Sequence, residues 1–367
     1  MSASSAQGPT TAQRPDERRR APSTCSLVRI DSSDPTWVEF LSSQSDSTAF
    51  HHPAWSAVLA ESYGYRPFVV ALAEEGGRLH AGLPMMEVRG VLGRRRWISL
   101  PFTDYCPALV PDSRLREALV QGLAALQADD GPRLIEIRAE LPGADVFRSV
   151  RGLRHTLELR SDPEAVLRTF NRSQVRRGID RAKRDGVTVR WATSKPDLTE
   201  RFFDLHARTR RRQGVPVQPR RFFGALWERM IEPRLGFVLL AYDGDTPIAA
   251  AVFLVWNGTV IYKFGASDTN FWKLRPNHLL FWEAIRWGCE TGHHRFDFGR
   301  TDLDNEGLRA FKSGWGTTED PLVYSTIADT PPRGRSGLAQ PGLAALIRHS
   351  PLWVTRAMGA ALYRYAA

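Results

Sequence analysis

Acidic and basic side chains gather in the segment FDFGRTDLDNEGLRAFKSGWG, residues 296–316. On a strand, Asp297 would point to the opposite face from the two phenylalanines that flank it. A buried carboxylate needs a cationic partner, and we expect Arg300 or Lys312 to supply it. Such a cluster could stabilise negative charge that develops during a reaction. The alternative is a solvated acidic loop at a sheet edge, with Lys312 as an exposed lysine of a short helix.

The elements predicted around this segment place its polar groups at the carboxyl end of a strand. The pattern predicts a strand that ends at Gly265, a helix from about Asn277 to Thr291, a strand Arg295–Phe298 and a short helix that carries Lys312. Asn277 is a favourable N-cap residue. The helix has too many apolar positions for one narrow stripe, so we expect it to be buried on more than one side. Open α/β sheets bind ligands at the carboxyl ends of their strands.

The run LRPNHLLFWEAIRWG, followed by FDFGRTD and GLRAFKSGWG, resembles the FemAB-like branch of the GNAT acyltransferase superfamily. That branch includes the peptidoglycan-bridge aminoacyltransferases and the BioF-like acetyltransferase domains. The resemblance covers about Phe50 to Ile327 and is strongest from Tyr262 to Trp315. It implies an α/β fold with mixed sheets, in which tandem GNAT-like domains form a substrate groove near their junction. It also implies transfer of an acyl or aminoacyl group to an amino or hydroxyl acceptor on a cell-envelope or polysaccharide precursor.

The resemblance also assigns roles to single residues. Lys312 matches a lysine that is thought to stabilise charge at the reacting centre of the aminoacyl-transferring relatives. We expect Arg300 to assist it and Asp297 to orient both cations or to act as a base. The segment Thr103, Asp104, Tyr105 lies between two prolines at a strand end and is similar to a family segment that faces the substrate groove, although an ordinary turn is the alternative. The remaining candidate substrate-binding residues are Lys263, Arg176, Arg275, Asn277 and His278.

The acyl donor stays open between acyl-coenzyme A and an aminoacyl-tRNA. Ordinary GNAT enzymes bind the coenzyme A pyrophosphate on backbone N–H groups of a Gly-rich loop at a helix start. The equivalent residues here, 274–278, contain no glycine, and Pro276 removes one donor. Arg275 keeps the helix start favourable for anions. Two further functions remain as alternatives: a coenzyme A-dependent N- or O-acetyltransferase of a small molecule, and a non-catalytic protein that binds an anionic glycan or RNA.

The sequence shows no pattern typical of metal, thiol or serine-hydrolase chemistry. Three cysteines have no metal-ligand spacing and form no disulfide framework. There is no P-loop and no G-x-S-x-G motif. We therefore expect no metal cofactor.

Length and composition predict a cytoplasmic protein of one large or two medium domains, and the resemblance implies two. The 367 residues are 42% hydrophobic, no apolar run approaches the ~20 residues of a membrane span, and the N-terminus lacks the apolar core of a signal peptide. The predicted organisation is a disordered tail over residues 1–24, an N-terminal GNAT-like domain over 25–150, a C-terminal acyltransferase domain over 151–328, and a linker with an amphipathic helical tail over 329–367.

The net charge of +10 favours acidic partners such as phosphorylated precursors, tRNA or an anionic membrane surface. One helix is predicted from Pro163 onwards, with an apolar stripe on one face and arginines, Arg176 among them, on the other. That basic face either contacts phosphates or is merely solvated. The C-terminal tail either lies on the inner face of a membrane or docks on the body of the protein.

Overall fold

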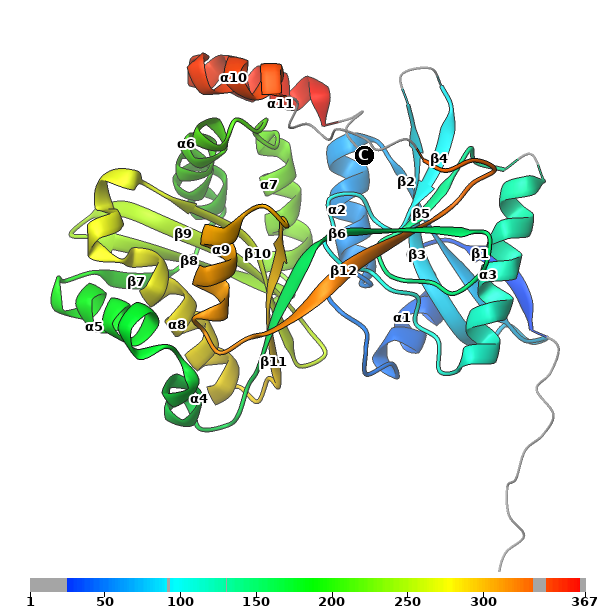
Figure 1. Cartoon of the computed structure of the whole chain (residues 1–367), viewed down its shortest axis with the longest axis horizontal. Coiled ribbons are helices and arrows are strands. Elements are labelled where there is room, and N and C mark those ends of the chain that lie inside the picture. Colours follow the sequence, from blue (N-terminus) through cyan, green and yellow to red (C-terminus); the bar gives the residue numbers. More distant parts are fainter. Residues whose placement is uncertain (1–24, 91–92, 130, 333–340, 364–367) are drawn as a thin grey trace, which may run out of the picture.

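The structure, a computed structural model, describes residues 25–90, 93–129, 131–332 and 341–363. The predicted disordered tail, residues 1–24, lies outside this part. Twelve strands of the described part form one mixed sheet in the order β1-β2-β3-β4-β5-β12-β6-β11-β10-β9-β8-β7 (Figure 1). The strands are β1 (Ser26–Ile30), β2 (Arg66–Ala73), β3 (Leu79–Arg89), β4 (Arg95–Ile98), β5 (Ile135–Ile137), β6 (Val146–Glu158), β7 (Thr188–Trp191), β8 (Gly236–Asp243), β9 (Thr246–Trp256), β10 (Thr259–Ser267), β11 (Arg295–Thr301) and β12 (Thr318–Ile327).

The two halves of the sheet repeat one pairing pattern. Strands β1 to β4 pair antiparallel and β5 joins β4 in parallel; β7 to β10 pair antiparallel and β11 joins β10 in parallel. The last strand of each half then crosses over: β6 pairs with β11, and β12 pairs with β5 and β6. The prediction of a tandem α/β fold is therefore confirmed. The domain boundary predicted after residue 150 falls inside β6.

Residues 141–152 contain two glycines and a proline, a composition that predicts a loop. That prediction is wrong for most of the segment, because β6 begins at Val146. In the structure it forms ladders with β12 on one side and, from Leu153 on, with β11 on the other. Both partners lie far away in the sequence, so local composition does not reveal them.

Helices cover both faces of the sheet (Figure 1), and α1 and α2 show residue signals that begin and end helices. Asp34 caps α1 through its side chain, and Gly64 ends α2 with a φ of 74°. Ten of the fifteen residues of α8 are buried, as the dense apolar pattern predicts. The helices are α1 (Pro35–Ser42), α2 (Pro53–Tyr63), α3 (Ser113–Ala128), α4 (Pro163–Thr169), α5 (Arg177–Arg184), α6 (Phe203–Gln213), α7 (Arg220–Leu226), α8 (Pro276–Glu290), α9 (Glu306–Ser313), α10 (Pro341–His349) and α11 (Leu352–Leu362), with shorter π or 3₁₀ segments η1 (Arg172–Arg176), η2 (Asp197–Phe202), η3 (Trp227–Ile231) and η4 (Thr269–Leu274).

The single helix predicted from Pro163 onwards is broken into α4, η1 and α5. Phe170 has extended backbone angles, with ψ of 146°, and ends α4. The Asn171 side chain then accepts hydrogen bonds from the N–H groups of Ser173 and Gln174, both at 3.0 Å, and starts the next segment. An asparagine that can cap locally competes with a continuous helix.

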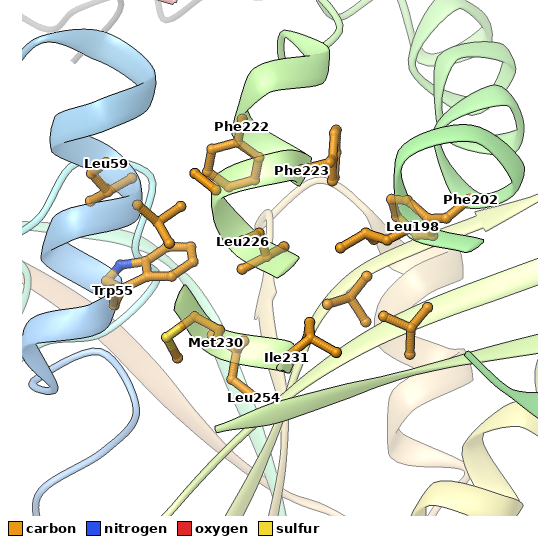
Figure 2. Close-up of a cluster of buried hydrophobic side chains, with 14 of the residues drawn as sticks. Trp55, Leu59, Leu198, Phe202, Phe222, Phe223, Leu226, Met230, Ile231 and Leu254 are labelled. Carbon is orange, nitrogen blue, oxygen red and sulfur yellow. The ribbon is translucent and has the colours of Figure 1, made fainter. Parts of the chain in front are cut away.

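A buried hydrophobic cluster joins the two halves of the chain (Figure 2). Trp55 and Leu59 of α2 face Phe222 and Leu226 of α7. The rings of Trp55 and Phe222 lie edge to face with centroids 6.2 Å apart. Burial of each such side chain contributes roughly 1.5–3 kcal/mol. The halves therefore share both a sheet and a core, which fixes the position of one relative to the other.

Candidate functional site at the junction of the two halves

Strands β10 and β11 stop pairing where the predicted site begins. Their parallel ladder joins residues 259–261 to residues 295–297, although the strands continue to Ser267 and Thr301. Both strands also have a register irregularity with their other neighbours just beyond this ladder. Polar side chains from both halves of the molecule meet at the end of β11.

Asp297 is a buried carboxylate that holds this strand end in place. Its Oδ2 accepts two hydrogen bonds from Arg154 of β6, from Nε at 2.8 Å and from Nη2 at 2.7 Å. Its Oδ1 accepts the N–H of Gly299 at 2.7 Å. The prediction that Arg300 or Lys312 partners Asp297 is wrong, because Arg154 lies on the adjacent strand. Since both carboxylate oxygens are engaged, the geometry suits a positioning role better than that of a base.

Lys312 is buried, with 2% of its surface exposed. Its Nζ donates to the carbonyl oxygens of Gly299 at 3.0 Å and Arg300 at 2.8 Å. Burial lowers the pKa of Lys312 to about 8, and the nearby charge of Asp104 opposes that shift. The interpretation of Lys312 as an exposed helix lysine is therefore wrong. Phe311, the preceding residue of α9, is half-buried.

Asp104 and Lys263 approach the same strand end from opposite halves. The Asp104 carboxylate is 31% exposed and lies 4.0 Å from the Nζ of Lys263. A Cβ placed on Gly299 would be 3.2 Å from the Asp104 Oδ2, so this carboxylate touches the turn that Asp297 and Lys312 hold. Lys263 is buried, donates to the carbonyl oxygen of Phe102 at 2.6 Å, and has its pKa lowered by burial.

The other candidates of the proline-flanked segment divide between core and site. Thr103 is fully buried, and its hydroxyl accepts a hydrogen bond from the Trp55 indole at 2.8 Å, so it faces the core. Tyr105 is half-buried, and its ring lies 4.6 Å from the guanidinium carbon of Arg154. Tyr105 also lines a cavity of about 280 Å³ together with Pro321 of β12. The segment is more than an ordinary turn, since its backbone carries Asp104 into the site.

Arg300 lies at the mouth of the site and is partly exposed. Its guanidinium donates to the Oδ1 of Asp302, at 3.0 Å from Nε and 2.5 Å from Nη2. About a third of its side chain, 34%, stays accessible. It is therefore held in place and still open to a ligand.

The four remaining candidates lie outside this cluster, at the end of η1 and the start of α8. In the described part, no hydrogen bond or ion pair joins Arg176, Arg275, Asn277 or His278 to Asp104 or to either site lysine. The predicted N-cap at Asn277 is wrong, because Arg275, with a φ of 58°, precedes Pro276 at the first helical position. His278 is buried over Gly178, where an added Cβ would lie 2.6 Å from its ring, and burial lowers its pKa to about 4.

The candidate residues do not include Arg154, Arg138 or Tyr324, although all three support the site. The Tyr324 hydroxyl of β12 donates to the carbonyl oxygen of Asp104 at 2.7 Å. Arg138 donates to the carbonyl oxygen of Thr103 at 3.2 Å and lies 5.0 Å from the Tyr324 ring. The available signals were an arginine within β6 and another directly after β5, but the partners of both depend on how β6 and β12 cross between the two halves of the sheet.

Two kinds of feature are absent from the described residues. They contain no group of three or more His, Cys, Asp or Glu side chains that could hold a metal ion. Among the helices that the structure describes, none has the length and apolar character required to span a bilayer.

Comparison with known proteins finds similarity in part of the sequence and in the fold. Residues 169–313 match the family model for the acetyltransferase (GNAT) domain. The structure of FemX superposes with a TM-score of 0.63 at 14% identity, covering 82% of this chain and 96% of FemX. That of L-PGS from Bacillus licheniformis gives a TM-score of 0.52 at 14% identity, covering 90% and 98%. Residues 169–313 are thus similar to the acetyltransferase (GNAT) family, and the fold of the chain is similar to that of FemX.

Two curated relatives match a short part of the chain. The lipid II:glycine glycyltransferase of Staphylococcus epidermidis is 33% identical over 76 residues, which are 19% of this chain and 18% of that protein. The protein of the same description from Staphylococcus haemolyticus is 31% identical over 86 residues, which are 22% and 20%. The match thus spans about a fifth of the length of these relatives.

Proposed function

We propose that this protein is an acyltransferase that transfers an acyl or aminoacyl group to an amino or hydroxyl acceptor on a cell-envelope precursor. The observation that carries the proposal is the meeting of buried Lys312 with partly exposed Asp104 at the junction of the two halves. The relatives described as lipid II:glycine glycyltransferases support an envelope acceptor. A solved structure with a similar fold, the C-terminal domain of a putative lysylphosphatidylglycerol synthetase from Agrobacterium fabrum, supports the same class of acceptor.

The site has the two groups that acyl transfer needs. The acceptor must lose a proton, and the oxyanion of the tetrahedral intermediate must be stabilised. Asp104 takes the proton, since its carboxylate is partly exposed whereas that of Asp297 is buried. Lys312 has three N–H donors, of which two bind the carbonyl oxygens of Gly299 and Arg300. The third is free to bind the oxyanion.

Asp297 and Lys263 position these groups. Asp297 ties Gly299 to Arg154, which fixes the carbonyl oxygens that direct Lys312. Lys263 holds the Asp104 carboxylate from the other side. As the new bond to the acyl carbon forms, the bond to the donor's leaving oxygen or sulfur breaks, and the proton on Asp104 can return to the leaving group.

The start of α8 supports an aminoacyl-tRNA as the donor in preference to acyl-coenzyme A. Pro276 has no N–H, and the N–H of His278 already donates to the carbonyl oxygen of Arg275 at 3.0 Å. Few backbone donors therefore remain to bind a pyrophosphate. A coenzyme A-dependent acetyltransferase remains the alternative, because Arg275 still makes this helix start favourable for anions.

Transfer of a labelled group tests the proposal. The purified chain is incubated with either labelled aminoacyl-tRNA or labelled acetyl-coenzyme A, together with lipid II or its soluble nucleotide precursor. We expect label in the acceptor, and we expect Asp104→Asn to abolish it while Lys195→Met, a change at an exposed lysine on another surface, does not. No transfer from either donor, combined with tight binding of the precursor, would favour the non-catalytic binding protein. Stoichiometric micromolar binding of acetyl-coenzyme A in calorimetry would reverse the preferred donor.

A further inference from the structure

An arginine hollow lies where α6, the start of η4 and the C-terminal helices meet. We use this name for the cavity of about 380 Å³ that is lined by Arg208, Arg211, Arg212, Arg348 and Asp268. Three of its guanidinium groups are held by the protein: Arg208 binds Asp268 at 3.2 Å, Arg211 binds the carbonyl oxygen of Arg348 at 3.3 Å, and Arg212 binds that of Ser267 at 3.4 Å. Each guanidinium has five N–H donors, so most donors remain free. Four arginines face one carboxylate, which makes the hollow suited to anions.

The C-terminal helices α10 and α11 bind the body of the protein with one face only. Ile347 and Thr355 are fully buried, and both helices contact α6. Figure 1 shows them lying along the outside of α6. On the other face Leu346 is 56% exposed and Trp353 is 72% exposed. Both expectations for the tail thus have a basis: its inner face docks on the protein, and its outer face is apolar and uncovered.

The surroundings of this outer face are basic and aromatic. Residues 341–367 contain three arginines and no acidic residue. Trp272 of η4 is 47% exposed, and its ring lies 5.0 Å from the guanidinium carbon of Arg212. Tryptophan favours the boundary between lipid and water, and arginine binds phosphate through paired N–H donors. Exposed tryptophans beside guanidinium groups with unused N–H donors therefore favour contact with a phospholipid surface.

We propose that the arginine hollow and the outer face of α10 and α11 form a docking surface for an anionic phospholipid bilayer. The hollow takes a headgroup phosphate, while Trp353 and Leu346 enter the interface between headgroups and acyl chains. This surface is independent of the residues assigned to acyl transfer. It would keep the protein beside a membrane-bound acceptor.

Vesicle sedimentation with the full chain tests the proposal. We expect binding to vesicles of phosphatidylcholine mixed with phosphatidylglycerol, little binding to phosphatidylcholine alone, and weaker binding as salt screens the charges. The double variant Arg211→Gln, Arg348→Gln should bind at least tenfold more weakly, because each basic residue near an anionic surface contributes severalfold to affinity. Trp353→Ser should weaken binding severalfold without changing the fold, since its side chain is exposed.

Matched controls remove the same kinds of group elsewhere. Arg168→Gln with Arg184→Gln removes two exposed arginines from α4 and α5, and Leu126→Ser removes an exposed apolar residue from α3. Both should bind vesicles as the parent does, and so should Lys312→Met, which separates this test from that of the acyl-transfer site. The proposal is overturned if the parent does not bind the anionic vesicles at low salt, or if the hollow variants and Trp353→Ser bind unchanged. Binding of a tRNA-sized RNA that depends on the same arginines, without vesicle binding, would overturn it in favour of a nucleic-acid surface.

Discussion

Replacement of Lys312 by Met removes one positive charge and keeps most of the side-chain stem. Two of the three Nζ donors orient the group against the Gly299 and Arg300 carbonyl oxygens, and one remains for the reacting centre. Loss of one oxyanion donor costs about 10²–10³ in kcat, or roughly 2.7–4 kcal/mol. We expect a fall of this size with little change in KM, because the interaction is made in the transition state.

The dependence of kcat on pH provides a second test of the role of Lys312. Burial lowers the pKa of Lys312 from 10.5 to about 8, so its protonated form is lost as pH rises through about 8. If the cation is the active form, kcat should fall over that range, and the Lys312→Met variant should lack that fall. The stability of the fold depends on pH in the opposite direction to kcat. The folded pKa lies below the unfolded one, so this group's contribution to the free energy of unfolding increases from pH 8 to about 10.5 and is least below pH 8.

Single-turnover kinetics with the donor and acceptor found by the label-transfer assay would measure both effects, with thermal melting as a check on folding. Lys195→Met is the matched control, since that lysine is exposed and pairs only with Glu228 in the described part. Near-normal turnover of Lys312→Met, or a parent enzyme whose kcat does not fall above pH 8, would refute the assignment. Stabilisation of the oxyanion would then be assigned to Arg300.

Three further variants test a support of the site, the basic face of η1 and α5, and the docking of the C-terminal tail. Arg154→Met should lower the free energy of unfolding by about 3–5 kcal/mol, because it leaves the buried Asp297 carboxylate without its cation; a thermal midpoint equal to that of the parent would contradict this. Arg176→Gln with Arg177→Gln should hardly change stability but should weaken binding of a phosphorylated precursor and flatten its salt dependence, and unchanged affinity at low salt would mark the basic face as merely solvated. Tyr363, directly after α11, is 2% exposed and belongs to the hydrophobic cluster that joins the two halves. Tyr363→Ala should therefore lower the free energy of unfolding by about 3–5 kcal/mol and should expose the tail to proteolysis; a protease-resistant tail would show that other contacts hold it.

The local parts of the fold follow from local signals. The turn at Asn257 and Gly258, with φ of 45° and 69°, joins β9 to β10 as an Asn-Gly pair predicts. A left-handed Gly64 likewise ends α2, and a turn with glycines at positions 76 and 77 joins the antiparallel strands β2 and β3. Each of these depends on a few neighbouring residues whose backbone preferences agree with the final structure.

The contacts of the site depend on chain segments that are distant in sequence. The sequence marks Asp297 as a carboxylate in need of a cation, but the cation comes from Arg154, 143 positions away. It marks Asp104 without showing that Tyr324, 220 positions away, holds its backbone. These pairs form because β6 and β12 cross over to pair with strands of the other half. The residue pattern within a single strand does not reveal such pairing. Asn277 shows the same limit on a small scale, since the left-handed backbone at Arg275 displaces the cap that composition favours.

The exchange of the two final strands also determines the order in which the protein can be completed during synthesis. Strand β6 ends at Glu158, but its neighbours β11 and β12 begin at Arg295 and Thr318. At ~5–20 residues per second, β6 leaves the ribosome roughly seven to thirty seconds before either neighbour exists. Through that interval β5 and β6 present unpaired edges that can pair with other chains. The nascent first half therefore needs protection by a chaperone or by slow collapse, and neither half expressed alone should form a stable, monomeric protein.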